Sequence, residues 1–119
     1  MTEPALYRAC TDGNYDRVEI LLRGNADPNI CDKYKKSPLM MASKYGHAKI
    51  VEKLLKCHAN INHQDEDGET ALYRACYGKG YYDVVEILLR ENADPNICNN
   101  SYKKMSPCNR THVHSYHNA

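Results

Sequence analysis

The side chains of this chain that are best suited to chemistry are four potential metal ligands near the C-terminus. They are Cys108, His112, His114 and His117. Structural zinc sites usually hold pairs of ligands on a turn or a helix, and this segment has little apolar sequence that would fold it. We therefore interpret the segment as a disordered tail, and we expect neither a metal nor a cofactor.

A catalytic centre needs a nucleophile and a base that a third group orients, or paired carboxylates in a cleft. Cys10 and Cys76 occupy one repeated position on a predicted packing face, and His47 and His58 fall at repeated positions with structural explanations. The Gly-Lys-Gly sequence at 78–80 follows a predicted helix rather than a strand, which argues against a phosphate loop. We therefore expect a protein that is not an enzyme.

Composition gives no global electrostatic reason for binding nucleic acid or a membrane surface. The 119 residues include 16 basic and 15 acidic side chains, for a net charge of +1. No stretch approaches the roughly 20 apolar residues that cross a bilayer, and the N-terminus lacks an export signal pattern. We expect a cytoplasmic chain, with the nucleus as the alternative compartment. Because most of the six cysteines recur at repeated positions, we expect reduced thiols rather than a disulfide framework.

Internal repetition is the strongest signal in the sequence. The word ALYRAC occupies residues 5–10 and returns at 71–76, while NADPNIC occupies 25–31 and returns at 92–98. SPLMMA at 37–42 holds the same frame midway between the two copies of ALYRAC. The repeat unit is therefore about 33 residues long, within the range of roughly 20 to 50 residues that indicates a solenoid of stacked units.

The repeat frame predicts one domain over residues 1–100 with units at about 1–34, 35–67 and 68–101. Each unit has two short apolar stripes at helical spacing, which predict helices near 4–11, 15–23, 38–45, 49–56, 71–78 and 82–90. Helices this short are unstable alone, so pairing and stacking must stabilise them. The remaining residues, 102–119, begin a fourth unit that degenerates, so we read the chain as part of a longer array.

These features resemble the ankyrin repeat, whose signature T-P-L-H-x-A is matched by PALYRA, SPLMMA and TALYRA. Tetratricopeptide arrays have a similar period but lack the Asn- and Asp-rich linker. The resemblance implies an all-α, ankyrin-repeat solenoid of helix-turn-helix units with protruding β-turn linkers. Two departures stand out: the signature histidine is replaced by Tyr7, Met40 and Tyr73, and Lys35 stands where the next unit has Gly68.

The resemblance also implies a non-catalytic module that binds a partner protein on the concave face of the stack. The first linker tip is basic and aromatic, and the second is acidic, with Asp65 among its acids. Tyrosine is enriched at interfaces, and we expect three tyrosines to form a row across the groove. The predicted contact residues are Lys33, Tyr34, Lys36, Met41, Lys44, Tyr45, Glu66, Asp67, Glu69, Arg74, Tyr77 and Lys79.

The alternative hypothesis is a fragment of a larger adaptor or regulatory protein, such as a ubiquitin-ligase substrate adaptor or a kinase-linked protein, whose activity lies in another domain. In either case the expected partner is another protein, with no nucleic acid and no membrane. The chain itself is expected to be a monomer, or to self-associate weakly through uncapped ends.

Overall fold

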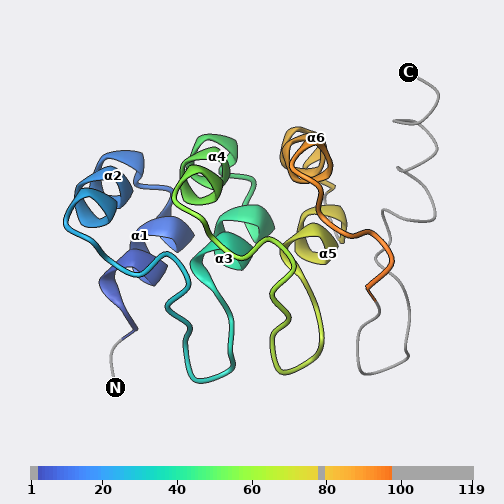
Figure 1. The fold of residues 1–119 in the computed structure, drawn as a ribbon, viewed down its shortest axis with the longest axis horizontal. Coiled ribbons are helices and arrows are strands. Elements are labelled where there is room, and N and C mark those ends of the chain that lie inside the picture. The colour runs from blue at the N-terminus through green and yellow to red at the C-terminus, as the bar shows by residue number, and fades with distance from the viewer. Residues whose placement is uncertain (1–2, 78–79, 98–119) are drawn as a thin grey trace.

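The computed structural model describes residues 3–77 and 80–97, which form six helices and no strand. The helices form two layers, with α1, α3 and α5 in one and α2, α4 and α6 in the other (Figure 1). Their bounds closely follow the predicted ones, so the all-α solenoid is confirmed. They are α1 (Ala5–Asp12), α2 (Tyr15–Arg23), α3 (Pro38–Lys44), α4 (Ala48–Lys56), α5 (Ala71–Cys76) and α6 (Tyr82–Arg90).

Capping side chains mark where inner helices α3 and α5 begin, and glycines mark where the chain reverses after α1 and α3. The hydroxyl of Ser37 accepts a hydrogen bond from the amide of Met40, and Thr70 caps α5 in the same way. Gly13 and Gly46 adopt left-handed φ angles of 74° and 76° at the reversal between helices. A Cβ at either glycine would also collide with an aromatic ring of the following unit, so the stacking itself requires glycine there.

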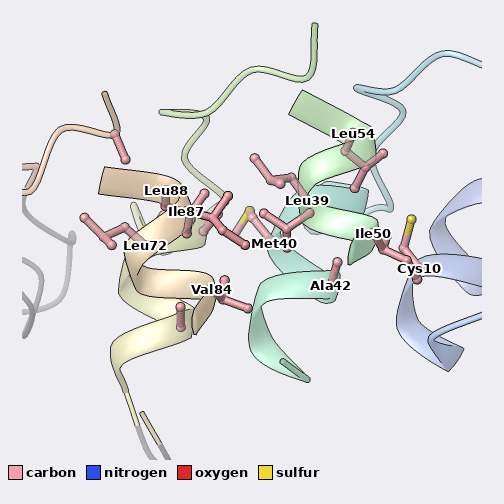
Figure 2. Packing of buried hydrophobic residues seen from close by; sticks show 14 of the residues in the cluster. Cys10, Leu39, Met40, Ala42, Ile50, Leu54, Leu72, Val84, Ile87 and Leu88 are labelled. Carbon is pink, nitrogen blue, oxygen red and sulfur yellow. The ribbon is translucent and has the colours of Figure 1, made fainter. Parts of the chain in front are cut away.

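The hydrophobic core lies between the two helical layers and runs along the stack. Leu39 is 1% exposed, and Leu54 and Leu88 are fully buried. Figure 2 shows these leucines pointing into the space between neighbouring helices. Helix α3 packs against both α1 and α5, and α4 packs against both α2 and α6. Each buried leucine stabilises the fold by about 1.5–3 kcal/mol, and the middle unit takes part in both inter-unit contacts.

The linkers that join the units are held by asparagine side chains. Asn25, His58 and Asn92 each adopt a positive φ just after an outer helix, a conformation that Asn and His tolerate better than most residue types. Further along the linkers, the Asn29 side chain accepts a hydrogen bond from the amide of Asn60 at 2.7 Å, across the unit boundary. Each linker is therefore fixed both by its own backbone and by its neighbour.

Cys10 and Cys76 both lie in the buried core, as predicted, but they differ in redox state. Cys10 is a fully buried free thiol, and burial raises its pKa to about 12. It therefore behaves as a small apolar residue. Cys76, at the equivalent position of the third unit, is disulfide-bonded, so the expectation of a reduced thiol is wrong there.

Three sequence predictions lie outside the described residues: the contact role of Lys79, the degenerate fourth unit, and the tail with its metal-ligand types. Along the part of the chain that is described, no helix combines the length and the apolar character that crossing a membrane requires.

Candidate protein-interaction surface

Two turn-rich loops project side by side from the inner helical layer (Figure 1). We call residues 25–37 finger 1 and residues 58–70 finger 2. An aspartate organises the tip of finger 1. The Asp32 Oδ1 atom accepts hydrogen bonds from the amides of Tyr34 at 2.8 Å and Lys36 at 2.9 Å. The backbone of Asp32 also bonds Lys35 and Lys36, so one residue closes the whole turn.

Asp65 repeats this arrangement at the equivalent position of finger 2. Its Oδ1 atom accepts from the amides of Asp67 at 2.8 Å and Glu69 at 3.0 Å. The amide of Gly68 donates to the carbonyl of Asp65, as that of Lys35 does to Asp32. Lys35 and Gly68 both have positive φ, at 65° and 78°. The backbone of the two tips is therefore the same, although Lys35 carries a steric strain that Gly68 avoids.

The second carboxylate oxygen distinguishes the two fingers. In finger 1, the Tyr7 hydroxyl donates to Asp32 Oδ2 at 2.9 Å. Tyr7 stands at the signature histidine position, so in this unit a phenol at that position bonds the finger. Burial raises the pKa of Tyr7 well above its usual value, and the bond to Asp32 adds to this shift.

The Asp32 carboxylate stays ionised for an identifiable reason. Burial acts to raise the pKa of Asp32, but hydrogen bonds from the Lys36 amide, the Tyr7 hydroxyl and the Tyr34 amide outweigh it. The pKa of Asp32 therefore lies below its ordinary value. The anion is the form that these donors stabilise.

In finger 2 the second oxygen belongs to an ion-pair network. The Arg74 guanidinium donates to Asp65 Oδ2 at 3.2 Å and pairs with Glu69 at 3.0 Å, and Lys36 Nζ approaches the same Asp65 oxygen to 3.8 Å. The Asp65 side chain is fully buried. Burial raises the pKa of Glu69, and Arg74 opposes that shift.

Contacts between the fingers fix their relative position. The amide of Glu66 donates to the carbonyl of Tyr34 at 3.1 Å. The His63 Nε2 atom lies 2.7 Å from the carbonyl oxygen of Lys35 and 3.5 Å from the Cys31 sulfur. Together with the Lys36–Asp65 ion pair, these bonds join the tips into one surface.

Three tyrosines on finger 1 and at the ends of inner helices are exposed. Tyr34 is 47% exposed at the tip of finger 1, with the ammonium groups of Lys33 and Lys36 at 5.1 and 5.4 Å from its ring centroid. Tyr45 and Tyr77 follow the C-terminal ends of α3 and α5 and are 42% and 64% exposed.

The single row of three tyrosines stays a prediction, and the three occupy two kinds of position in the repeat unit. Tyr34 precedes α3 and Tyr45 follows it, so the length of that helix, about 10 Å at 1.5 Å per residue, separates them. Tyr45 is contacted by Lys44, whose ammonium lies 5.2 Å from the ring centroid, and Tyr77 stacks on Tyr73 with ring centroids 5.2 Å apart. The tyrosines form two groups, one on a finger and one at the helix ends.

The prediction that Met41 is an exposed contact is wrong. Met41 is only 7% exposed, because α3 is covered on both sides by α1 and α5. Arg8, at the equivalent position on α1, has a side chain that is 66% exposed. Of the predicted charged contacts, Lys36, Glu69 and Arg74 are engaged in the network around Asp65, whereas Lys33, Lys44, Glu66 and Asp67 are exposed.

A hollow between α1 and finger 1 adds residues that were not predicted as contacts. Its lining includes Asp12, Asn14 and Arg17 together with Lys33 and Tyr34. Asp12 could have been predicted from the repeat alignment, because it is the equivalent of Tyr45 in the preceding unit. The hollow extends the surface from finger 1 to helix α1 and the start of α2.

The carboxylates of Asp65, Asp67 and Glu69 have oxygens within 4.8 Å of one another, a spacing that a metal ion would suit. However, Asp65 already accepts from two amides and from Arg74, and Lys36 adds a second cation. The ion pairs account for this cluster, and we assign no metal to it.

Comparison with known proteins agrees with the repeat geometry. The family model described as ankyrin repeats matches residues 6–99 in three copies. This chain belongs to the ankyrin repeat family. Ankyrin repeats are protein-interaction modules and are generally non-catalytic, so at this level the predicted function is supported.

Curated relatives carry the same repeats within longer proteins. The chain is 46% identical over 101 residues to the ankyrin repeat and KH domain-containing protein mask-1 of Caenorhabditis elegans, covering 82% of this chain and 4% of that protein. It is 31% identical over 99 residues to the ankyrin repeat-containing protein P1E11.10 of Schizosaccharomyces pombe, covering 83% and 46%. Ankyrin repeat, SAM and basic leucine zipper domain-containing protein 1 of Carollia perspicillata is 43% identical over 94 residues, covering 76% and 20%. The chain therefore spans less than half the length of each.

Proposed function

We propose that this ankyrin chain binds a partner protein through the two fingers and the exposed ends of the inner helices. The observation that carries the proposal is the exposure of Tyr34 on finger 1 and of Tyr45 and Tyr77 just after inner helices α3 and α5. None of the three contributes to the buried core, although a tyrosine ring is large and apolar. Aromatic side chains of this kind supply much of the binding energy in protein interfaces.

The rigidity of the fingers supports the same proposal. Asp32 and Asp65 hold the tips in one backbone conformation, and the bond between Glu66 and Tyr34 joins them. A preformed surface loses little conformational entropy when a partner binds. The fingers therefore suit a stable recognition role.

The names of the relatives support a modular context. Two of them combine ankyrin repeats with a KH domain, or with SAM and basic leucine zipper domains. We propose that the chain acts as an interaction part in proteins of this organisation, in the cytoplasm or the nucleus, as a scaffold or adaptor and without binding nucleic acid or membrane itself. A ubiquitin-ligase adaptor or a kinase-linked protein is the alternative context. We further propose that the chain is a monomer, with weak self-association only.

Affinity capture tests this function. The wild-type chain and the triple variant Tyr34→Ala, Tyr45→Ala, Tyr77→Ala would be immobilised and exposed to the same lysate, with bound proteins quantified by mass spectrometry. The expected result is at least one protein that the wild type enriches and the triple variant loses. Tyr82→Ala is the control, because Tyr82 is 60% exposed on outer helix α6. Equal capture by the wild type and the triple variant, with both folded, would contradict the proposal.

A further inference from the structure

One arginine recurs in two copies of the same sequence word but has different partners in them. Arg8 and Arg74 are both the fourth residue of ALYRAC. Arg74 pairs with Glu69 at 3.0 Å and with the buried Asp65 at 3.2 Å, and its side chain is 21% exposed. Arg8 pairs with Glu3, the equivalent of Glu69, at the longer distance of 3.6 Å, and its side chain is 66% exposed. Within the described part of the chain, Arg8 pairs with no second carboxylate.

Arg8 lines the hollow between α1 and finger 1, at the N-terminal end of the stack (Figure 1). Arg17 and Lys33 also line this hollow and are exposed. Neither of them forms an ion pair with a described residue. Three cations therefore border one hollow, and only one of them has a carboxylate partner among the residues that the structure describes.

The acidic side chains of the hollow differ in how much hydrogen-bonding capacity they have left. Asp32 already accepts hydrogen bonds from the Tyr7 hydroxyl and from the amides of Tyr34 and Lys36. Asp12 is exposed and has no ion pair within the described residues. A guanidinium offers five N–H donors, so the unused capacity of the hollow is mostly donor capacity. An anionic acceptor would satisfy it.

The balance of charge distinguishes between two kinds of anion. Three basic and three acidic side chains line the hollow, so it has no net charge with which to attract a dianion such as phosphate. A single carboxylate needs only a local contact with one arginine. The chain contains that contact already, because Arg74 donates to Asp65 in the third unit.

The size of the hollow indicates a peptide rather than a small molecule. Its volume is about 1260 Å³, which exceeds the roughly 300–1,000 Å³ of typical small-molecule sites. Pro4 and Ala5 add apolar surface to the lining. A peptide segment can contact the apolar and the charged parts together, whereas a small carboxylate would leave most of the space to water.

We propose that the hollow binds an acidic segment of a partner protein. One carboxylate of this segment accepts hydrogen bonds from the Arg8 guanidinium, as Asp65 does from Arg74. Arg17 and Lys33 supply further cations for neighbouring acidic residues of the segment. This inference rests on the proposed function, because it identifies the chemistry that the partner presents to the same surface.

Selection from a display library of random peptides tests this chemistry without a known partner. The wild type is expected to enrich peptides that contain aspartate or glutamate, and Arg8→Gln is expected to lose this enrichment. Arg8→Gln removes only an exposed ion pair, which contributes little to stability, and circular dichroism checks that it folds. The matched control is Arg23→Gln, which should keep the enrichment. Arg23 is also exposed and pairs with Glu19 at 3.5 Å, but it lies on outer helix α2 and does not line the hollow.

Fluorescence anisotropy with one enriched peptide then identifies the carboxylate that Arg8 binds. Arg8→Gln should weaken binding about tenfold, the usual effect of losing a hydrogen bond between charged groups. An Asp-to-Asn change in the peptide should weaken binding to the wild type by a similar factor. The same change should have little further effect on Arg8→Gln, because the effects of two groups in direct contact are not additive.

A change of opposite sign sharpens the test. Asp12 lies one helical turn from Arg8 on α1 and lines the same hollow. Asp12→Asn removes a like charge beside the bound carboxylate, so it should tighten binding of the acidic peptide about two- to threefold.

Three results would overturn this inference. They are no enrichment of acidic peptides by the wild type, equal binding of an enriched peptide by the wild type and the folded Arg8→Gln variant, or equal weakening by Arg23→Gln. If capture of a partner from lysate still depends on the three tyrosines, the proposed function stands and only the acidic contact fails. If capture is also independent of the tyrosines, both fail.

Discussion

The two fingers share a backbone but differ in charge and in burial. Asp32 and Asp65 close the two tips with the same pair of side-chain hydrogen bonds to the amides two and four positions on. The remaining oxygen binds a phenol in finger 1 and two cations in finger 2. One aspartate per unit is thus sufficient to shape a finger, which leaves the exposed tip residues free to differ.

Burial makes the two aspartates unequal in their contribution to stability. The Asp65 side chain is fully buried, whereas Asp32 is only partly buried. A buried carboxylate and its cations depend on each other, because removing one partner leaves a charge without compensation. Finger 2 should therefore tolerate loss of its aspartate less well than finger 1.

The largest expected effect is that of Asp65→Ala. It should lower the free energy of unfolding by about 3–5 kcal/mol, because Arg74 and Lys36 lose a buried counter-charge. Asp32→Ala should cost about 1.5–3 kcal/mol, the usual value for lost hydrogen bonds to a charged group. Urea unfolding followed by circular dichroism measures both. Equal costs for the two variants would show that burial does not distinguish the fingers.

Substitution of the tip residues with positive φ, Lys35 and Gly68, should change the free energy of unfolding by a smaller amount. Lys35→Gly should stabilise the chain and Gly68→Ala should destabilise it, each by about 1 kcal/mol, because only glycine adopts this conformation without steric cost. Thermal unfolding of both variants checks the signs. A loss of stability in Lys35→Gly would mean that the lysine side chain contributes more than its backbone strain costs.

The smallest expected effect is on how the free energy of unfolding changes with pH. Because the pKa of Asp32 is lowered on folding, its stabilising contribution is present above the unfolded pKa and is lost as the pH falls through the folded one. The raised pKa of Glu69 acts in the opposite sense, so its protonation favours the folded state. Between about pH 5 and 3, Asp32→Asn should lose stability less steeply than the wild type and Glu69→Gln more steeply. Parallel curves in urea titrations would contradict these assignments.

The fold was predictable because the same words recur in each unit. The repeat period located all three helix pairs, and the position of Ser37 and Thr70 before the apolar stripes located two helix starts. Repetition averages out the ambiguity of any single short helix. The turn residues Asn25, His58 and Asn92 were predictable for the same reason.

The interaction surface was only partly predictable, because residue type does not reveal burial by neighbouring units. The sequence indicated a basic first finger and an acidic second one. It did not indicate that Asp65 is buried beneath Arg74 and Lys36, or that Met41 is covered on both sides by adjacent inner helices. These features arise from contacts between units rather than within one.

Quantitative binding of a captured partner tests the central claim most directly. Isothermal titration calorimetry would compare the wild type with Tyr34→Ala, Tyr45→Ala and Tyr77→Ala, and with the outer-helix controls Ile20→Ala and Tyr82→Ala, which also remove exposed apolar side chains. At least one of the three tyrosine variants should lose about 2 kcal/mol of binding free energy, roughly 30-fold in Kd, while the outer-helix controls bind normally. Normal binding by all three tyrosine variants, together with loss of binding in a folded outer-helix variant, would place the interface on the outer helices and contradict the account.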